Sequence, residues 1–133
     1  MAFPKFVYKI IDAPPPSPIP HALPLSPLDS QSGFIHLSDA KQIPITADLF
    51  FSETSTIWLL KVSSAKAEEE KGRLVWPEGL PGCVHLYAET EGTWARLGDG
   101  IVVDVKKYDK GAGEKWVDAL KEPDDGKWLV DLY

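Results

Sequence analysis

The chain has 133 residues, 44% of them hydrophobic and 26% charged, which is an ordinary composition for a globular protein. This length suits one domain, so we expect residues 1–133 to form a single domain. The net charge is −6, from 20 acidic and 14 basic residues, and the basic residues form no run. We therefore expect no nucleic acid duplex as a partner, because binding to a phosphate backbone needs clustered positive charge. One or two cations would still suffice to hold a small anionic ligand.

The compartment is predicted from the cysteine content and from the start of the chain. Cys83 is the single cysteine, so an internal disulfide is excluded. The first residues, MAFPKFVYKIIDA, do not have the basic and then apolar pattern of a secretion signal. No apolar stretch approaches the roughly 20 residues that cross a bilayer. We expect a cytoplasmic protein without a membrane partner.

The first half of the chain alternates strand patterns with turn and loop signals. Phe6–Ile11 predicts a strand, and residues 13–27 predict a proline-rich surface loop, because seven prolines remove backbone donors there. The loop is interpreted as an insertion, with a docking site for a protein partner as the alternative. Leu28–Ser38 predicts a turn that leads into a second strand, with Gly33 at its entry. Asp39–Phe51 predicts a helix that Pro44 interrupts.

The second half contains more short strand patterns. The predicted elements, in order, are an interior strand at Ile57–Val62, a polar connection at Ser63–Gly72, a short pairing segment at Arg73–Trp76, a strand at Cys83–Ala88, a hairpin of Thr93–Leu97 with Ile101–Tyr108, a helix at Ala112–Glu122 and a strand at Gly126–Tyr133. Strands and helices do not alternate regularly. This order favours an α+β fold over a doubly wound parallel sheet.

Two predicted strands each carry a histidine beside a hydroxyl-bearing residue. Residues two apart on a strand share a face, so His36 lies with Phe34 and Ser38, and His85 lies with Cys83 and Tyr87. The opposite faces are aliphatic and suit the core. A polar cleft would provide hydrogen-bond partners for the histidine faces, so we expect any active site to be built around His36 and His85. The alternative is a structural role, with the ring nitrogens satisfied inside the protein.

Two further segments are candidates for the walls of the same cleft. Trp76 and Glu78 place a flat aromatic ring and a carboxylate just before a turn. Trp94 and Arg96 share a face of a predicted strand, and an arginine beside an indole suits recognition of an anion with stacking. The alternatives are core packing for the tryptophans and a surface ion pair for Arg96.

Other catalytic classes are disfavoured. A zinc site would need a third ligand, and the candidates Asp29, Asp39 and Glu78 show no motif spacing to the histidines, so we predict no metal. Cys83 and His85 lie two apart on a strand, roughly 6–7 Å from each other, which is too far for a nucleophile and its base. No G-x-S-x-G, P-loop or Rossmann glycine pattern occurs.

At GFIHLS (residues 33–38) and HLY (residues 85–87) the chain resembles a known family of small bacterial and fungal proteins, catalogued as domain of unknown function 952. The most specific match is GFIHLS at residues 33–38. The other matches follow in the family's order: Tyr8, Lys9, Ile10, Ser26, Asp29, Gln42, Thr46, Ala47, Phe50, Phe51, residues 59–62, Leu74, Trp76, Glu78 and residues 84–88. The chain departs from the family pattern at Cys83, Val84 and Ala88, and in the proline-rich loop, where the family has a short helix. Residues 109–133 resemble a C-terminal extension.

The resemblance implies a fold similar to that of ADP-ribosyltransferases, with two packed mixed sheets and a cleft between them. It implies that His36 with Ser38 holds the nicotinamide ribose of NAD, and that His85 with Tyr87 corresponds to a second aromatic motif. The catalytic glutamate of many transferases has no clear counterpart. Glu78, Glu89 and Glu91 are candidates by composition only.

The leading hypothesis is a histidine-lined cleft for an NAD-like or nucleotide-like small molecule, with ADP-ribosyl or phosphoryl transfer as the reaction. NAD would be a substrate, and no cofactor is predicted with certainty. The predicted catalytic residues are His36, His85 and Tyr87, and the predicted ligand-binding residues are Asp29, Gly33, Ser38, Trp76, Glu78, Trp94 and Arg96. His85, with an ordinary pKa of about 6.5, suits general acid or base chemistry. The alternative hypothesis is a non-catalytic module that binds a small metabolite or a protein.

Overall fold

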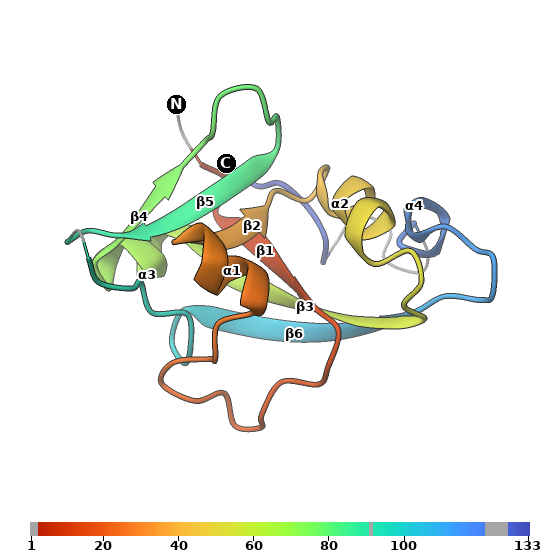
Figure 1. Ribbon diagram of the computed structural model, residues 1–133, viewed down its shortest axis with the longest axis horizontal. Coiled ribbons are helices and arrows are strands. Elements are labelled where there is room, and N and C mark those ends of the chain that lie inside the picture. The colour runs from red at the N-terminus through yellow and green to blue at the C-terminus, as the bar shows by residue number, and fades with distance from the viewer. Residues whose placement is uncertain (1–2, 91, 122–127) are drawn as a thin grey trace.

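The computed structural model describes residues 3–90, 92–121 and 128–133. Its helices and strands, in chain order, are β1 (Phe6–Ile11), α1 (Pro27–Ser32), β2 (Ile35–Ser38), α2 (Ile43–Phe50), β3 (Thr56–Ser63), α3 (Ser64–Glu69), β4 (Gly72–Val75), β5 (Cys83–Ala88), β6 (Val102–Asp109) and α4 (Trp116–Ala119). Figure 1 shows how these helices and strands are arranged. The fold is α+β, as the sequence predicts.

The named strands form a single six-stranded sheet in the order β4-β5-β2-β1-β3-β6, and all its neighbouring strands are antiparallel. The predicted pair of packed sheets is therefore wrong. The reason lies in β1, which pairs along its whole length with β3 and also pairs with β2, where Tyr8 lies opposite Ser38. This one pairing joins the β4-β5-β2 half to the β1-β3-β6 half.

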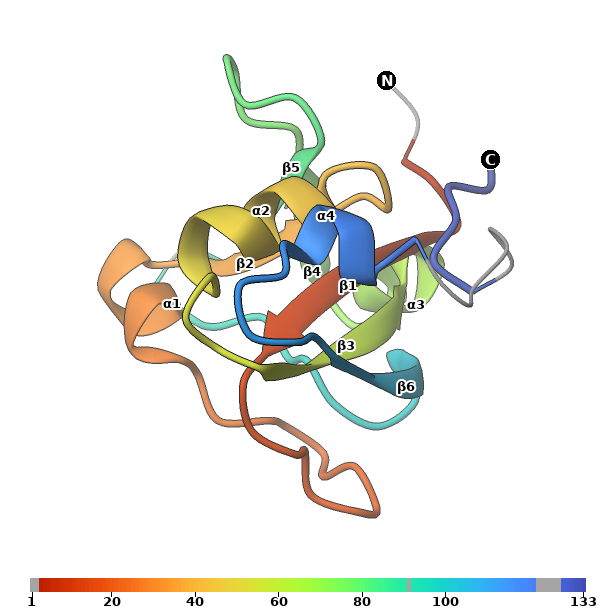
Figure 2. The same cartoon turned by 90° about the vertical axis from the view of Figure 1, so that its right-hand side faces the viewer.

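The sheet has a hydrophobic core on each face. Helices α2 and α4 lie side by side over one face (Figure 2), where Tyr8, Leu59 and Trp116 are buried. Val7, Leu60 and Val84 belong to the core of the other face. Ile19, Leu23 and Leu25 of the proline-rich loop pack against this second core. The loop thus covers part of the sheet, although several of its residues are exposed.

Three helices differ from the sequence predictions. Helix α1 stands where a turn was expected: the Ser26 hydroxyl accepts the Asp29 N–H at 3.1 Å, and Gly33, with φ of +85°, ends the helix. Pro44 lies in the first turn of α2, where its missing N–H costs nothing, so the predicted interruption is wrong. Helix α3 begins after Ser63 in the predicted polar connection, and the Ser63 hydroxyl accepts the Lys66 N–H at 3.2 Å.

The C-terminal third differs most from expectation. β6 pairs with β3 and not with residues 93–97, which form no strand, so the predicted hairpin is wrong. Ala95 and Leu97 are instead buried in the core. Helix α4 covers a shorter range than predicted, and residues 128–133 form no strand, while Gly126 and Lys127 of the predicted strand lie outside the described residues. None of the described helices has the length and apolar character to span a membrane.

Candidate functional site

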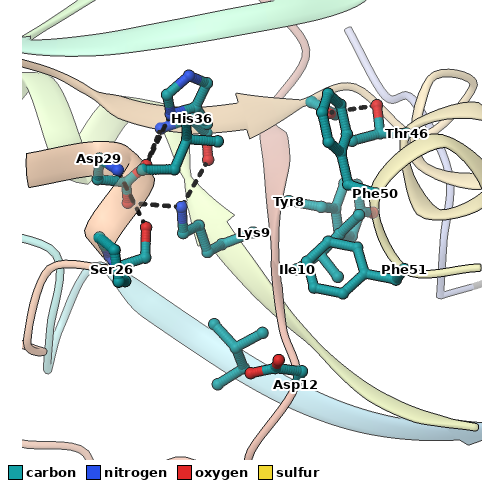
Figure 3. A pocket seen from close by; sticks show the side chains of 14 residues that line it. Tyr8, Lys9, Ile10, Asp12, Ser26, Asp29, His36, Thr46, Phe50 and Phe51 are labelled. Atoms are coloured by element: carbon teal, nitrogen blue, oxygen red, sulfur yellow. Dashed lines mark hydrogen bonds and ion pairs between the residues drawn. The ribbon is translucent and has the colours of Figure 1, made fainter. Parts of the chain in front are cut away.

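A buried carboxylate connects α1 to the predicted histidine strand. Asp29 lies in α1 with 2% of its surface exposed, and its Oδ1 accepts the His36 N–H at 3.0 Å and contacts His36 Nδ1 at 2.7 Å. An ionised carboxylate can only accept hydrogen bonds, so Nδ1 carries the ring proton and donates it. Figure 3 shows the second ring nitrogen of His36 pointing away from Asp29. The carboxylate thereby fixes both the tautomer and the orientation of the imidazole.

The other carboxylate oxygen of Asp29 is bound by a lysine from β1. Lys9 Nζ lies 2.6 Å from Asp29 Oδ2 and donates to the His36 carbonyl oxygen at 3.1 Å. β1 and β2 pair only between Tyr8 and Ser38, so no backbone N–H of β1 pairs with the His36 carbonyl oxygen. The Lys9 side chain supplies the hydrogen-bond donor for that oxygen instead. Three segments of the chain therefore meet at one carboxylate (Figure 3).

The charges of this network compensate one another. Burial alone would raise the pKa of Asp29, but the hydrogen bonds from His36 and the nearby Lys9 charge outweigh it and hold the pKa below its ordinary value of 3.8. Burial lowers the pKa of Lys9 from its ordinary 10.5, and the Asp29 charge opposes this change. Asp29 is consequently ionised at neutral pH and has a cationic partner at contact distance.

A cavity of about 420 Å³ opens beside this network, between α1 and α2. Most of its wall is apolar, and its polar side chains gather around Asp29 and His36. It is lined by Tyr8, Lys9, Ile10, Ile11, Asp12, Ser26, Pro27, Leu28, Asp29, His36, Ser38, Thr46, Phe50 and Phe51. The volume is that of a site for a small organic molecule. Because 34% of the His36 side chain is exposed, the ring is accessible to such a molecule.

His85 has different surroundings from His36, although the two residues are paired across β5 and β2. Their ring centroids lie 5.7 Å apart, and the Phe34 ring stacks on His85 with centroids 3.8 Å apart. Burial, and then the nearby His36, lower the pKa of His85 below its ordinary 6.5. His36 lines the cavity and His85 does not. His36 thus has the features of a residue in a ligand site, and His85 has those of a structural histidine.

The remaining predicted residues on β2 and β5 lie close to the histidines. Ser38 lines the cavity, and its Oγ lies 3.5 Å from Thr46 Oγ1. Tyr87 contacts Phe34, with ring centroids 5.2 Å apart. Gly33 ends α1, and its N–H donates to the Asp29 carbonyl oxygen at 3.0 Å, so it helps to place Asp29 without lining the cavity.

The predicted aromatic and acidic wall residues do not line this cavity. Trp76 stacks on Phe3 with ring centroids 4.8 Å apart and packs against the core, while 44% of Trp94 is exposed. Glu78 lies between β4 and β5. The structure does not bring these three side chains together with His36.

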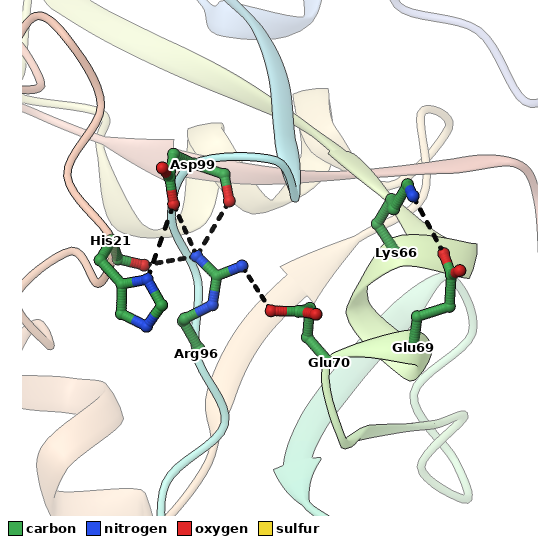
Figure 4. A network of polar contacts seen from close by, with 6 residues as sticks. All are labelled: His21, Lys66, Glu69, Glu70, Arg96 and Asp99. Carbon is green, nitrogen blue, oxygen red and sulfur yellow. Dashed lines mark hydrogen bonds and ion pairs between the residues drawn. The ribbon is translucent and has the colours of Figure 1, made fainter.

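Arg96 fixes the proline-rich loop to the body of the protein. Its guanidinium donates to the His21 carbonyl oxygen at 2.7 Å, to Asp99 Oδ1 at 2.9 Å and to Glu70 Oε1 at 2.7 Å (Figure 4). The Leu23 N–H donates to the Leu97 carbonyl oxygen nearby, at 2.8 Å. Two carboxylates already compensate the Arg96 charge, and only 16% of the side chain is exposed.

Metal binding and thiol chemistry find little support in the described residues. In that part of the chain, no three histidine, cysteine, aspartate or glutamate side chains are arranged to hold a metal ion. Burial, together with the charge of Asp39, raises the pKa of Cys83 above its ordinary 9.0. The Cys83 side chain therefore stays a thiol at neutral pH.

Sequence reasoning named Asp29 and His36 but assigned no role to Lys9. The available signal was a charged residue in the otherwise apolar strand FVYKII. A lysine in an interior strand needs a buried anion, and Asp29 is the carboxylate that meets this need.

Comparison with known proteins assigns the chain to a family. The model of the family described as "Protein of unknown function (DUF952)" matches residues 20–96, more than half of the chain. The chain belongs to this family. The matched range contains Asp29, His36 and His85, whereas Lys9 lies before it. No curated protein matches the sequence.

Two crystal structures share the fold. They are those of protein CC0527 from Caulobacter crescentus and of a double mutant of it, with TM-scores of 0.58 and 0.57. Each is 21% identical in sequence to this DUF952 protein, and the match covers 83% of this chain and 91% of the chain in the crystal structure. Neither the family description nor these structures names an ADP-ribosyltransferase-like fold, so this assignment stays a proposal.

Proposed function

We propose that the cavity beside Asp29 and His36 binds a small molecule with a flat ring and a hydroxyl group, of the NAD-like or nucleotide-like class. The observation that carries the proposal is the 2.7 Å contact between His36 Nδ1 and the buried Asp29 carboxylate, at the wall of a 420 Å³ cavity. A histidine used only for packing needs no ionised partner at this burial. Burying the Asp29 carboxylate costs free energy, and a ligand that needs the His36 ring in a fixed orientation would explain why this cost is tolerated.

The fixed tautomer determines what His36 offers to a ligand. In the neutral imidazole with its proton on Nδ1, Nε2 has a free lone pair, which accepts a hydrogen bond from a ribose hydroxyl or takes a proton from it. Ser38 lines the same cavity and offers a hydroxyl group. The apolar wall formed by Ile10, Phe50 and Phe51 suits a flat ring such as nicotinamide or adenine.

ADP-ribosyl transfer is the reaction we propose for this site. The bond between nicotinamide and ribose breaks, the acceptor oxygen bonds to the same ribose carbon, and a base takes the acceptor proton. In this proposal His36 is the base, and its exposed ring at the cavity wall supports that role, while His85 stays neutral at its side because its pKa is lowered. The ADP-ribosyltransferase-like fold, with NAD as the substrate, belongs to this proposal.

A second candidate is a binding module without catalysis. Among the described residues, the carboxylates that line the cavity are Asp12 and Asp29, and Asp29 is engaged by Lys9 and His36. No described glutamate lines it, although a glutamate orients the ribose in many transferases. This observation favours binding without turnover.

An NMR titration of the histidine ring signals tests the proposal. We expect saturable shifts of the His36 signals with NAD or ADP-ribose, and weaker binding in Ser38→Ala, which removes a hydroxyl group from the cavity wall and keeps the Lys9–Asp29 pair. His21→Gln, which removes a histidine outside the cavity, is the matched control and should bind as the wild type does. Release of nicotinamide from NAD would then separate the transferase from the binding module. Unchanged His36 signals with NAD, ADP-ribose and nicotinamide would contradict the NAD-like ligand and favour a binding module for another metabolite or for a protein.

A further inference from the structure

A second cavity lies at the end of β5, beside Tyr87 and Ala88. It has a volume of about 480 Å³ and is lined by Gly33, Arg73, Tyr87, Ala88, Glu89, Thr90, Gly92 and Thr93. Its character differs from that of the first cavity, because hydroxyl, charged and backbone groups form most of the wall. Arg73 is its one cation among the described residues, and sequence reasoning gave Arg73 no role.

Arg73 is positioned by the pairing of β4 with β5. It lies opposite Tyr87, and its guanidinium carbon is 5.0 Å from the centroid of the Tyr87 ring. No described carboxylate lies within 4.0 Å of the guanidinium, unlike the two that contact Arg96. Lys9, the cation of the first cavity, is likewise paired with Asp29. Arg73 therefore has hydrogen-bond donors to offer to a ligand.

Aromatic contacts connect Arg73 to the first cavity. Tyr87 contacts Phe34 with ring centroids 5.2 Å apart, and Phe34 contacts His36 with centroids 4.5 Å apart. Arg73, Tyr87, His85 and His36 share one face of the sheet through the paired registers of β4, β5 and β2. The two cavities share none of their described lining residues, so one extended molecule that reaches from His36 to Arg73 would cross the Phe34 ring between them.

The two cavities differ in the charge that they present to a ligand. In the first cavity Asp29 compensates Lys9, so its apolar wall offers no excess positive charge to a phosphate. Arg73 offers a planar guanidinium, whose paired donors match the oxygens of a phosphate group. Glu89 lines the same cavity and opposes an anion, so Arg73 supplies a modest and salt-sensitive attraction.

We propose that Arg73 holds the phosphate of the ligand whose ring occupies the Asp29–His36 cavity, so that the substrate class is a phosphate-bearing nucleotide and not a neutral nucleoside. This inference rests on the proposed function for the ring, but its anion site is separately measurable. Tyr87 contributes by supporting the guanidinium through a cation–π contact.

The test uses three probes: ADP-ribose, adenosine and inorganic pyrophosphate. We expect Arg73→Gln to weaken the binding of ADP-ribose about tenfold and to leave adenosine binding unchanged, as expected for the loss of a charged hydrogen bond. Glu89→Gln should tighten the binding of ADP-ribose. Lys66→Gln removes a different exposed cation, one that pairs with Glu69, and is the control for net charge alone. Pyrophosphate should shift the Arg73 Nε–H NMR signal.

Each outcome separates the anion site from the ring site. If pyrophosphate shifts Arg73 while ADP-ribose leaves the His36 ring signals unchanged, the anion site is supported and the ring proposal fails. If ADP-ribose shifts His36 and Arg73→Gln binds it as the wild type does, the anion site is overturned and the ring proposal stands. An equal loss of ADP-ribose binding in Lys66→Gln would also overturn a specific role for Arg73. If neither probe shifts either residue, both proposals are overturned.

Discussion

His36 and His85 lie directly opposite each other on neighbouring strands, yet different partners surround their rings. His36 Nδ1 contacts the buried Asp29 carboxylate at 2.7 Å, whereas the His85 ring stacks on Phe34 with centroids 3.8 Å apart. A cross-strand pair normally shares one environment, since side chains opposite each other are neighbours on the same face. Here α1 supplies a carboxylate to only one of the two, and this difference leads to separate predictions for each.

Asp29→Asn should destabilise the fold strongly. The substitution leaves Lys9 buried without its charged partner and weakens the acceptor of two hydrogen bonds from His36. Removing one partner of a buried ion pair typically costs about 3 kcal/mol or more of unfolding free energy. Urea denaturation measures this loss. Glu69→Gln removes the partner of the exposed Lys66 and should change the midpoint little. Equal effects of the two variants would contradict a structural role for the buried pair.

The cost of Asp29→Asn should also depend on pH. The pKa of Asp29 is lower in the folded protein than its ordinary 3.8, so the ionised carboxylate stabilises the fold above that value. This stabilisation is lost as the pH falls from 3.8 through the folded-state pKa, because the unfolded chain takes up the proton first. Urea denaturation at pH 7, 5 and 3 should show the wild type and the variant converging at the lowest pH. A constant difference would contradict the lowered pKa.

His85 should make the protein less stable on mild acidification. Burial and the nearby His36 lower its pKa in the folded protein, so between the folded-state pKa and about 6.5 the unfolded chain binds more protons. The unfolding free energy therefore falls as the pH drops through this window. Replacing His85 by Asn or by Phe should remove this part of the pH dependence, although the two variants differ in polarity. Urea denaturation at pH 7.5 and 5.5 measures it, and an unchanged slope in both variants would contradict this origin.

The sequence predicted the histidine strands well because their pattern is local. Ile35 and Leu37 are buried and His36 is partly exposed, as alternation requires, and β1 has the predicted bounds of Phe6–Ile11. Two short strands with matching patterns also made their proximity a reasonable hypothesis. Their exact pairing, His36 opposite His85, depends on the order of strands in the sheet.

The partners of the site were harder to predict, because they come from distant segments. Lys9 meets Asp29 only after β1 is placed beside β2, and no spacing in the sequence encodes this contact. Residues 93–97 have the alternation of a strand, since Ala95 and Leu97 are apolar. These two side chains are buried in the core, although their backbone pairs with none of the described strands. The local pattern thus identified the buried side chains correctly but predicted the wrong secondary structure for this segment.

Trp116→Ala should destabilise the protein far more than Trp94→Ala. Trp116 is fully buried, and its indole N–H donates to the Phe51 carbonyl oxygen at 2.8 Å, while 44% of Trp94 is exposed. Removing a buried tryptophan typically costs about 3–5 kcal/mol. Thermal unfolding followed by circular dichroism compares the two variants. Because Trp116 lies in the segment 109–133, a small loss would contradict the participation of that segment in the core.

Gly98→Ala should displace the proline-rich loop. A Cβ atom at residue 98 would overlap the carbonyl group of His21 and the carbonyl oxygen of Pro20, and these backbone atoms cannot turn aside as a flexible side chain could. The Asp99 N–H donates to the Pro20 carbonyl oxygen at 2.9 Å beside this contact, so hydrogen exchange at Asp99 should become faster. We expect a loss of about 1–3 kcal/mol in unfolding free energy, as for an overpacked contact.

Gly111→Ala is the matched control for this substitution, because its Cβ would meet nothing closer than Glu114 Oε1 at 3.9 Å. It should leave both the unfolding free energy and the exchange at Asp99 close to those of the wild type. If Gly98→Ala behaves like this control, the loop does not need its close approach to residue 98. If exchange at Asp99 rises only in Gly98→Ala, the loop is held by this contact together with the Arg96 guanidinium.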